Sequence, residues 1–186
     1  MHCAKTIYNY RYITIYDSTI CAGTAIRTSC RTKQNKREES VKLIFGGAFQ
    51  GKLEQAKKEY EKEHPGVQPV IWDCPPPEKD QTACAEYLQR VDFYADIIDN
   101  LQHFTLACSR VGVNPGDILG EYAPALQNKI LICTDISQGL VPMEEDLRAW
   151  RETNGRTITA LAAASDTVIR MFCGIPQYLS KQEEDA

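Results

Sequence analysis

The sequence predicts an α/β fold, in which a mainly parallel central sheet lies between two layers of helices. Short apolar runs of strand length alternate with longer segments whose apolar residues recur at every third or fourth position. Several of the runs end in a glycine or an acidic residue, and ligands bind at the carboxyl ends of strands in such sheets. The 186 residues suffice for one domain of this kind and an appendage.

The first predicted strand and helix follow each other closely. Residues 41–45 (Val-Lys-Leu-Ile-Phe) form a short apolar run that suits a buried parallel strand. Residues 53–63 predict a helix, because Leu53, Ala56 and Tyr60 recur on one side and a Pro-Gly pair follows shortly after the end.

The middle of the chain predicts a strand, a long helix and a loop. Residues 70–72 form a second short strand, which is closed by Asp73 and a run of prolines. Residues 82–110 predict a helix, since apolar side chains recur there at three- and four-residue steps. Residues 112–120 begin and end with glycine and predict a loop.

The last third of the chain repeats the alternation. Residues 129–133 predict another buried strand. Residues 144–164 predict a helix, with an interruption at the Asn-Gly pair of residues 154–155. Residues 167–173 predict the last strand, and residues 181–186 form a charged tail.

Charge divides the chain near residue 40. Residues 1–40 carry seven Lys or Arg against three Asp or Glu, whereas the whole chain has a net charge of −4. We expect residues 1–40 to be a poorly structured extension and residues 41–180 to be the folded domain. The extension is either native or a translated leader, because residues 36–39 (Lys-Arg-Glu-Glu) can be encoded by codons resembling a ribosome-binding site and Val41 by a GTG start codon.

The composition and charge of the chain argue against several classes of function. The net charge of −4 provides no electrostatic footprint for nucleic acid or for an anionic membrane. No stretch approaches the roughly 20 apolar residues that cross a bilayer. The eight cysteines include no C-x-x-C pair, and Cys133 and Cys173 lie within apolar runs, as buried thiols do. We therefore expect a cytoplasmic protein with reduced thiols and neither nucleic acid nor membrane as a partner.

A glycine-rich segment between the first strand and the first helix fits the phosphate-loop pattern G-x-x-x-x-G-K. Glycines let the backbone bend until its N–H groups point at phosphate oxygens, and the helix dipole adds to this attraction. The pattern indicates a P-loop NTPase-like three-layer sandwich; a glycine turn with a solvated lysine is the alternative. The expected nucleotide-binding residues are Gly46, Gly47, Ala48, Phe49, Gln50, Gly51, Lys52 and Leu53.

Magnesium and catalysis require further residues. A hydroxyl normally follows the lysine and binds Mg²⁺, but Leu53 has none. Asp73 ends a strand and is either a Mg²⁺ ligand or a turn residue. Asp135 ends the strand of residues 129–133, where a carboxylate can hold a metal-bound water or orient a hydroxyl. We expect Lys52 and Asp135 to be catalytic.

Two later segments carry a family resemblance. Residues 134–142 (Thr-Asp-Ile-Ser-Gln-Gly-Leu-Val-Pro) resemble an N-E-V-G-x-G-I-V-P element, and residues 155–168 resemble a G-R-x-N-x-x-L-A-x-x-A-D-x-V element. Both elements are found in the cobinamide kinase/cobinamide-phosphate guanylyltransferase family. The glycine loop is similar to that family's G-G-x-x-S-G-K-S, except at Gln50 and Leu53. The resemblance fades between residues 64 and 128.

The resemblance implies a two-step enzyme of cobalamin biosynthesis. In the first step ATP or GTP, with Mg²⁺, phosphorylates the aminopropanol hydroxyl of adenosylcobinamide. In the second step GMP is transferred from GTP to that phosphate through a guanylylated histidine. The resemblance also implies a ring-like homo-oligomer. Arg156 is a candidate contact to substrate or phosphate, with a surface salt bridge as the alternative.

The chain departs from the family where the guanylylated histidine falls. The corresponding stretch between the phosphate-loop helix and the central helix holds residues 75–80 (Pro-Pro-Pro-Glu-Lys-Asp) and no histidine. His64 ends a helix, where a cap or surface role is expected, and His103 lies within a helical pattern. Guanylyl transfer therefore lacks its expected nucleophile. We expect a divergent cobinamide kinase-like phosphotransferase. The alternatives are a catalytically weakened nucleotide-binding relative with a sensor or accessory role, and a kinase with another acceptor.

Overall fold

The structure is a computed structural model that describes residues 41–137 and 139–179. The predicted extension over residues 1–40, its two explanations and the charged tail over residues 181–186 lie outside the described residues.

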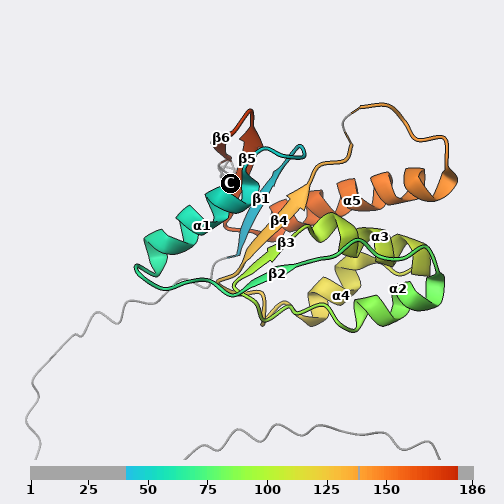
Figure 1. The fold of residues 1–186 in the computed structure, drawn as a ribbon, viewed down its shortest axis with the longest axis horizontal. Helices are drawn as coiled ribbons and strands as arrows, with labels where there is room; N and C mark the ends of the chain where they lie inside the picture. The colour runs from blue at the N-terminus through green and yellow to red at the C-terminus, as the bar shows by residue number, and fades with distance from the viewer. Residues whose placement is uncertain (1–40, 138, 180–186) are drawn as a thin grey trace, which may run out of the picture. The chain divides into compact units, whose positions relative to one another are not determined.

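A six-stranded sheet forms the centre of the described domain, in the order β2-β3-β4-β1-β5-β6 (Figure 1). Neighbouring strands from β2 to β5 run parallel, and β6 is antiparallel to β5. The mainly parallel sheet predicted from the sequence is therefore confirmed. The strands are β1 (Lys42–Gly46), β2 (Ile71–Asp73), β3 (Ile97–Asp99), β4 (Ile130–Thr134), β5 (Thr167–Phe172) and β6 (Ile175–Leu179).

Helices cover both faces of the sheet, because the central strands bury side chains on both sides. Leu43 and Leu131 face a core that also contains residues of α3, α4 and α5. The neighbouring Ile44 and Ile132 face the opposite core, which α1 covers through Ala56 and Tyr60. The helices are α1 (Lys52–Glu63), α2 (Gln81–Leu88), α3 (Leu101–Val111), α4 (Pro115–Glu121) and α5 (Glu145–Ala164).

The prediction of one helix over residues 82–110 is wrong. The segment contains α2, a connection, β3 and most of α3. Ile97 and Ile98 are both fully buried between β2 and β4, so the sheet takes residues whose spacing also fits a helix. Asn100 then turns the chain with a φ of 55°, and α3 starts at the next residue.

Two smaller predictions for the second half of the domain also need correction, and one strand was not predicted. The predicted loop over residues 112–120 contains α4, whose start carries an Asn114 cap and Pro115 at the first helical turn. The expected interruption of residues 144–164 is absent, since α5 is continuous through residue 154 and its buried Asn154 side chain. β6 was not predicted as a strand.

The carboxyl ends of the central strands meet at one edge of the sheet. Gly46 at the end of β1 is in register with Thr134 on β4 and with Met171 on β5. Asp135 donates its N–H to the Gly46 carbonyl at 2.9 Å, which extends the β1–β4 pairing by one bond. This edge therefore carries the glycine loop after β1 and the acidic residues after β3 and β4.

Candidate functional site

The segment between β1 and α1 is a folded loop, as a phosphate loop requires. Phe49 and Gly51 adopt left-handed backbone angles, with φ values of 57° and 74°. Gly51 is the N-cap of α1, and no side chain of the described residues caps this helix. The first N–H groups of α1 therefore have no side-chain cap within the described part of the chain, and uncapped N–H groups at a helix N-terminus are a common place for anions to bind.

Lys52 is the first residue of α1, and its side chain extends back to this loop. Its side chain is buried, and Nζ donates to the Gly47 carbonyl at 2.7 Å. Burial lowers the pKa of Lys52 below its ordinary value, while the negative charge of Asp99 opposes that effect. The ammonium is thus held at the loop and within the electrostatic field of a carboxylate on β3.

A cavity of about 400 Å³ connects the loop with the ends of β3 and β4. One wall consists of loop residues and the start of α1, including Lys52. The other wall comes from three further elements, namely the end of β3, the start of α3 and the end of β4. These residues are Asp99, Asn100, Gln102, His103 and Thr134.

Asp99 is the acidic residue in this cavity that sequence analysis missed. It is 9% exposed, and its Oδ1 accepts the Asn100 N–H at 2.7 Å. Burial raises the pKa of Asp99 above its ordinary value, and the charge of Asp73 adds to this, whereas the Asn100 N–H and Lys52 oppose it. The available signal was Ile-Ile-Asp at the end of a short apolar run, which the helical interpretation of residues 82–110 concealed.

Asp73 lies beside Asp99 but outside the lining of the cavity. The two residues are in register on β2 and β3. Asp73 is exposed, and its Oδ1 accepts the Asn100 side-chain N–H at 2.8 Å. The assignment of Asp73 as a Mg²⁺ ligand stays a prediction, and Asp99 has the better position for that role.

The backbone of Asp135 is bonded to Gly46 beside the glycine loop, but its carboxylate is bonded to Ser137, two residues further along the chain. Oδ1 accepts the N–H of Ser137 at 2.8 Å and also its hydroxyl. The residue that lines the cavity at this strand end is the preceding Thr134. The catalytic role predicted for Asp135 stays a prediction.

A buried polar network holds the end of β4 in place. The Gln102 side chain accepts the Thr134 N–H at 3.0 Å, and the Asn154 side chain donates to the Thr134 carbonyl at 3.0 Å. Asn154 is fully buried and also accepts the Thr105 hydroxyl at 2.9 Å. Since every one of these groups is paired, the network fixes Thr134 against both α3 and α5.

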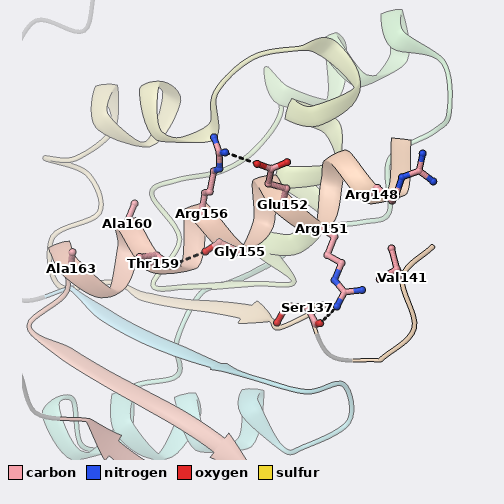
Figure 2. Close-up of a pocket in the computed structure, with 10 residues that line it drawn as sticks. All are labelled: Ser137, Val141, Arg148, Arg151, Glu152, Gly155, Arg156, Thr159, Ala160 and Ala163. Carbon is pink, nitrogen blue, oxygen red and sulfur yellow. Dashed lines mark hydrogen bonds and ion pairs between the residues drawn. The ribbon is translucent and has the colours of Figure 1, made fainter. Parts of the chain in front are cut away.

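Arg156 lies on the exposed side of α5, away from the phosphate-loop cavity. Figure 2 shows its guanidinium directed at Glu152, one turn earlier on the same helix. Both side chains are mostly exposed, so the pair contributes little to stability. Arg156 lines two other cavities, and its predicted contact with substrate stays a prediction.

The chemistry of the lining distinguishes the phosphate-loop cavity from a larger one. A cavity of about 990 Å³ lies near the amino ends of β1 and β5, where Val41 and Asp166 line it together with residues of α4 and α5. The phosphate-loop cavity is smaller but contains Lys52, Asp99 and His103. The larger cavity also contains Arg156 and Asp166 but is lined mainly by apolar and small residues. The convergence of Lys52, Asp99 and His103 therefore makes the smaller cavity the better candidate for catalysis.

The donor atoms near the loop determine how a magnesium ion could be held. The described residues contain no group of three or more His, Cys, Asp or Glu side chains that could hold a metal by themselves. Mg²⁺ commonly uses one or two carboxylates together with substrate phosphates and water, and Asp99 fits that pattern. Gln50 Oε1 is buried and has no hydrogen-bond partner among the described residues. Leu53 packs against the α1-side core.

Comparisons with known proteins add no family assignment. No protein-family model matches the chain, and a search of curated proteins finds no match. Among the described residues, no helix is both long enough and apolar enough to cross a membrane.

Proposed function

We propose that this chain is a divergent P-loop NTPase of the cobinamide kinase/cobinamide-phosphate guanylyltransferase kind. In this proposal it transfers a phosphoryl group from ATP or GTP to the hydroxyl of adenosylcobinamide, in cobalamin biosynthesis. The single observation that carries the proposal is the cavity that Lys52 and Asp99 share with a folded glycine loop, at the carboxyl edge of a mainly parallel sheet.

Each of these groups has a role in the proposed reaction. The loop amides and the N-terminus of α1 bind the phosphates, and Lys52 exchanges its bond to the Gly47 carbonyl for a phosphate oxygen. Asp99 would hold Mg²⁺ together with the nucleotide phosphates and water. When bound, Mg²⁺ neutralises the charge that develops on the β- and γ-phosphates. Thr134, which is hydrogen-bonded to Gln102 and Asn154, lines the cavity at the end of β4.

A second candidate function is nucleotide binding without efficient catalysis, in a sensor or accessory role. Leu53 favours it, because it supplies no oxygen where a phosphate loop normally binds Mg²⁺ through a hydroxyl. GMP transfer has less support than phosphorylation, because the stretch in which the resemblance places the guanylylated histidine contains no histidine. His64 stacks on Tyr60, with ring centroids 4.4 Å apart, and it is absent from the lining of the cavity.

The test combines nucleotide binding with product analysis. The full chain is incubated with labelled GTP or ATP, Mg²⁺ and cobinamide, and phosphorylated cobinamide is separated from free nucleotide. Lys52→Met should weaken nucleotide binding and reduce transfer by at least about 100-fold, since it removes the positive charge that stabilises the negative transferred group. Lys57→Met is the matched control, because Lys57 is an exposed lysine on the same helix.

The outcomes separate the two candidates. Transfer of phosphate to cobinamide that depends on Lys52 supports the kinase. Tight nucleotide binding without a product supports the second candidate. If millimolar nucleotide does not bind, or if Lys52→Met and Lys57→Met behave alike, both functions are excluded.

A further inference from the structure

We infer that His103 is the general base that takes the proton from the acceptor hydroxyl in this cavity. The inference rests on the proposed phosphotransferase function and adds a catalytic residue to it. His103 lies in the first turn of α3 and lines the cavity together with Lys52 and Asp99. From the sequence we expected His103 to be an ordinary histidine within a helix.

The backbone between β3 and α3 brings the carboxylate and the imidazole to the same cavity. Asp99 is the last residue of β3, and Asn100 turns the chain with its left-handed φ of 55°. Asn100 is held in this turn by its side chain, which donates to Asp73 and accepts from Gln102. A positive φ outside glycine is uncommon and occurs more often at functional sites, where the surroundings hold it in place.

The hydrogen bond made by the imidazole leaves the Nε2 lone pair available to accept a proton. His103 Nδ1 lies 2.7 Å from the carbonyl oxygen of Cys74. A carbonyl oxygen only accepts hydrogen bonds, so Nδ1 carries the proton and Nε2 of the neutral ring is the acceptor. The Cys74 carbonyl is positioned in turn, because the Cys74 N–H donates to the Asp99 carbonyl at 3.1 Å. The ring is thus oriented by a backbone group that is fixed to β3.

The carboxylates near the cavity are less suited to this proton transfer. Asp99 accepts from Asn100 and lies in the field of Lys52, which suits it to a metal ion. Asp73 accepts from Asn100, and Asp135 accepts from Ser137. Glu54 lines the cavity from α1 but is exposed to water. The His103 imidazole differs from these carboxylates, because Nδ1 is fixed by the Cys74 carbonyl and Nε2 takes no part in that bond.

The step balances with the nucleoside triphosphate as the co-reactant. The Nε2 lone pair of His103 takes the hydroxyl proton, and the hydroxyl oxygen forms a bond to the γ-phosphorus. The bond between the γ-phosphorus and the bridging oxygen breaks, and its electron pair stays on the β-phosphate of the departing nucleoside diphosphate. The products are the phosphate monoester, the diphosphate and an imidazolium, which then releases its proton to water.

The test uses two variants of His103 and a matched histidine. His103→Gln should lower kcat for phosphorylation of cobinamide by about 100-fold or more, and leave the Kd of the nucleotide within about threefold of the wild-type value. His103→Ala should lose as much activity and regain part of it when imidazole is added to the assay. His64→Gln should change neither quantity, because His64 packs on Tyr60 at the other end of α1. Nucleotide binding by each variant also verifies that it is folded.

Five results would overturn the inference, and the last of them would also remove the proposed function. His103→Gln turnover within threefold of wild type excludes a general base, as does a failure of imidazole to rescue His103→Ala. An acid-labile phosphoryl or guanylyl group on His103 would make it a nucleophile instead. Nucleotide binding by the wild-type chain without transfer to cobinamide would remove the base role and leave the nucleotide site intact. Absence of nucleotide binding would instead remove the proposed function as a whole.

Discussion

A side chain at position 46 would overlap with the backbone of β5, so glycine is the residue that fits there. A Cβ atom built on Gly46 would stand 2.4 Å from the carbonyl oxygen of Met171, and the φ of Gly46 is 153°. Both observations exclude other residues at the junction between β1 and the loop. The glycine loop therefore begins where the backbones of β1 and β5 lie in close contact.

We predict that Gly46→Ala destabilises the domain by about 2–4 kcal/mol, since the new methyl group must displace the backbone of a central strand. Gly155→Ala is the control, because Gly155 lies in α5 with no atom within 4 Å of its built Cβ. That substitution should stabilise the domain by about 0.5–1 kcal/mol through the better helix propensity of alanine. Denaturation in urea measures both values, and equal effects would contradict the explanation.

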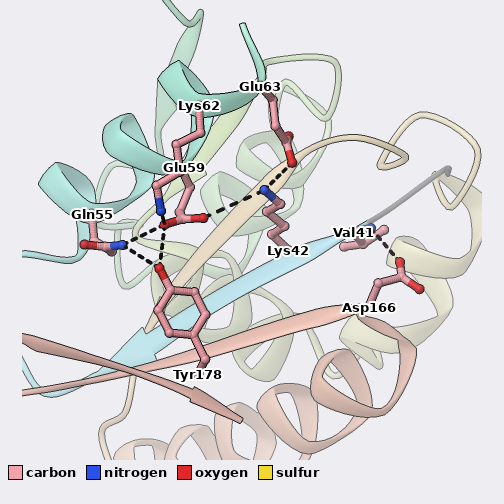
Figure 3. Close-up of polar contacts among 8 residues, drawn as sticks. All are labelled: Val41, Lys42, Gln55, Glu59, Lys62, Glu63, Asp166 and Tyr178. Carbon is pink, nitrogen blue, oxygen red and sulfur yellow. Dashed lines mark hydrogen bonds and ion pairs between the residues drawn. The ribbon is translucent and has the colours of Figure 1, made fainter. Parts of the chain in front are cut away.

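At the scale of elements, a charged cluster joins α1 to the sheet (Figure 3). Glu59 on α1 is 5% exposed and accepts from Lys62 at 2.6 Å and from the Tyr178 hydroxyl of β6 at 2.7 Å. Lys42 at the start of β1 lies 3.9 Å from Glu59 and donates to Glu63. The helix that carries Lys52 is thus held at its far end by ion pairs to a central strand and by a hydrogen bond to an edge strand.

This cluster should make stability depend on pH. Burial by itself raises the pKa of Glu59, but the bonds from Lys62 and Tyr178 and the charges of Lys62 and Lys42 outweigh it and lower the pKa below the ordinary 4.5. A lowered folded-state pKa stabilises the fold above the unfolded value, and this contribution is lost as the pH falls from 4.5 through the folded value.

We therefore predict that Glu59→Gln destabilises the domain at pH 7 and that its difference from wild type shrinks below pH 4.5. Urea unfolding from pH 3 to pH 7 measures the two curves. Glu121→Gln, at an exposed position on α4, should give a curve parallel to that of wild type. A Glu59→Gln difference that is constant over the whole range would show that the carboxylate is not stabilised by its neighbours.

At the scale of the whole molecule, the candidate site exists only where several elements meet. The loop after β1, the start of α1, the end of β3, the start of α3 and the end of β4 all contribute to the phosphate-loop cavity. A ligand that binds there stabilises the folded domain over the unfolded chain, because the unfolded chain does not bring these elements together.

We predict that ATP or GTP with Mg²⁺ raises Tm of the full chain. At a nucleotide concentration 100 times Kd the stabilisation is about 2.7 kcal/mol, which corresponds to a rise in Tm of roughly 5–10 °C for a domain of this size. A thermal shift titration measures it, and Lys52→Met should abolish most of the rise. A nucleoside without phosphates is the control ligand, and an equal rise with that ligand would argue against a phosphate site.

Sequence patterns predicted the structure correctly where the local preference of a segment agrees with its tertiary environment. The run at residues 41–45 is apolar on both sides and became β1, and the glycines after it became a turn that no other residue type forms as easily. The start of α5 was also predicted within one residue. Sequence analysis failed at Ile97-Ile98-Asp99, since a short apolar run fits a helix or a strand equally well until its neighbours are known.

The sequence by itself determined the alternation of strands and helices, the mainly parallel sheet and the glycine loop ahead of Lys52, because these depend on local spacing and on backbone freedom. Only the tertiary structure decided which residues share the cavity. The strand order placed β4 between β1 and β3. This arrangement brought Asp99 and His103 to the cavity that contains Lys52, and it left Arg156 on the exposed side of α5. Such neighbours are far apart along the chain, so their meeting depends on how the strands pair and not on any local pattern.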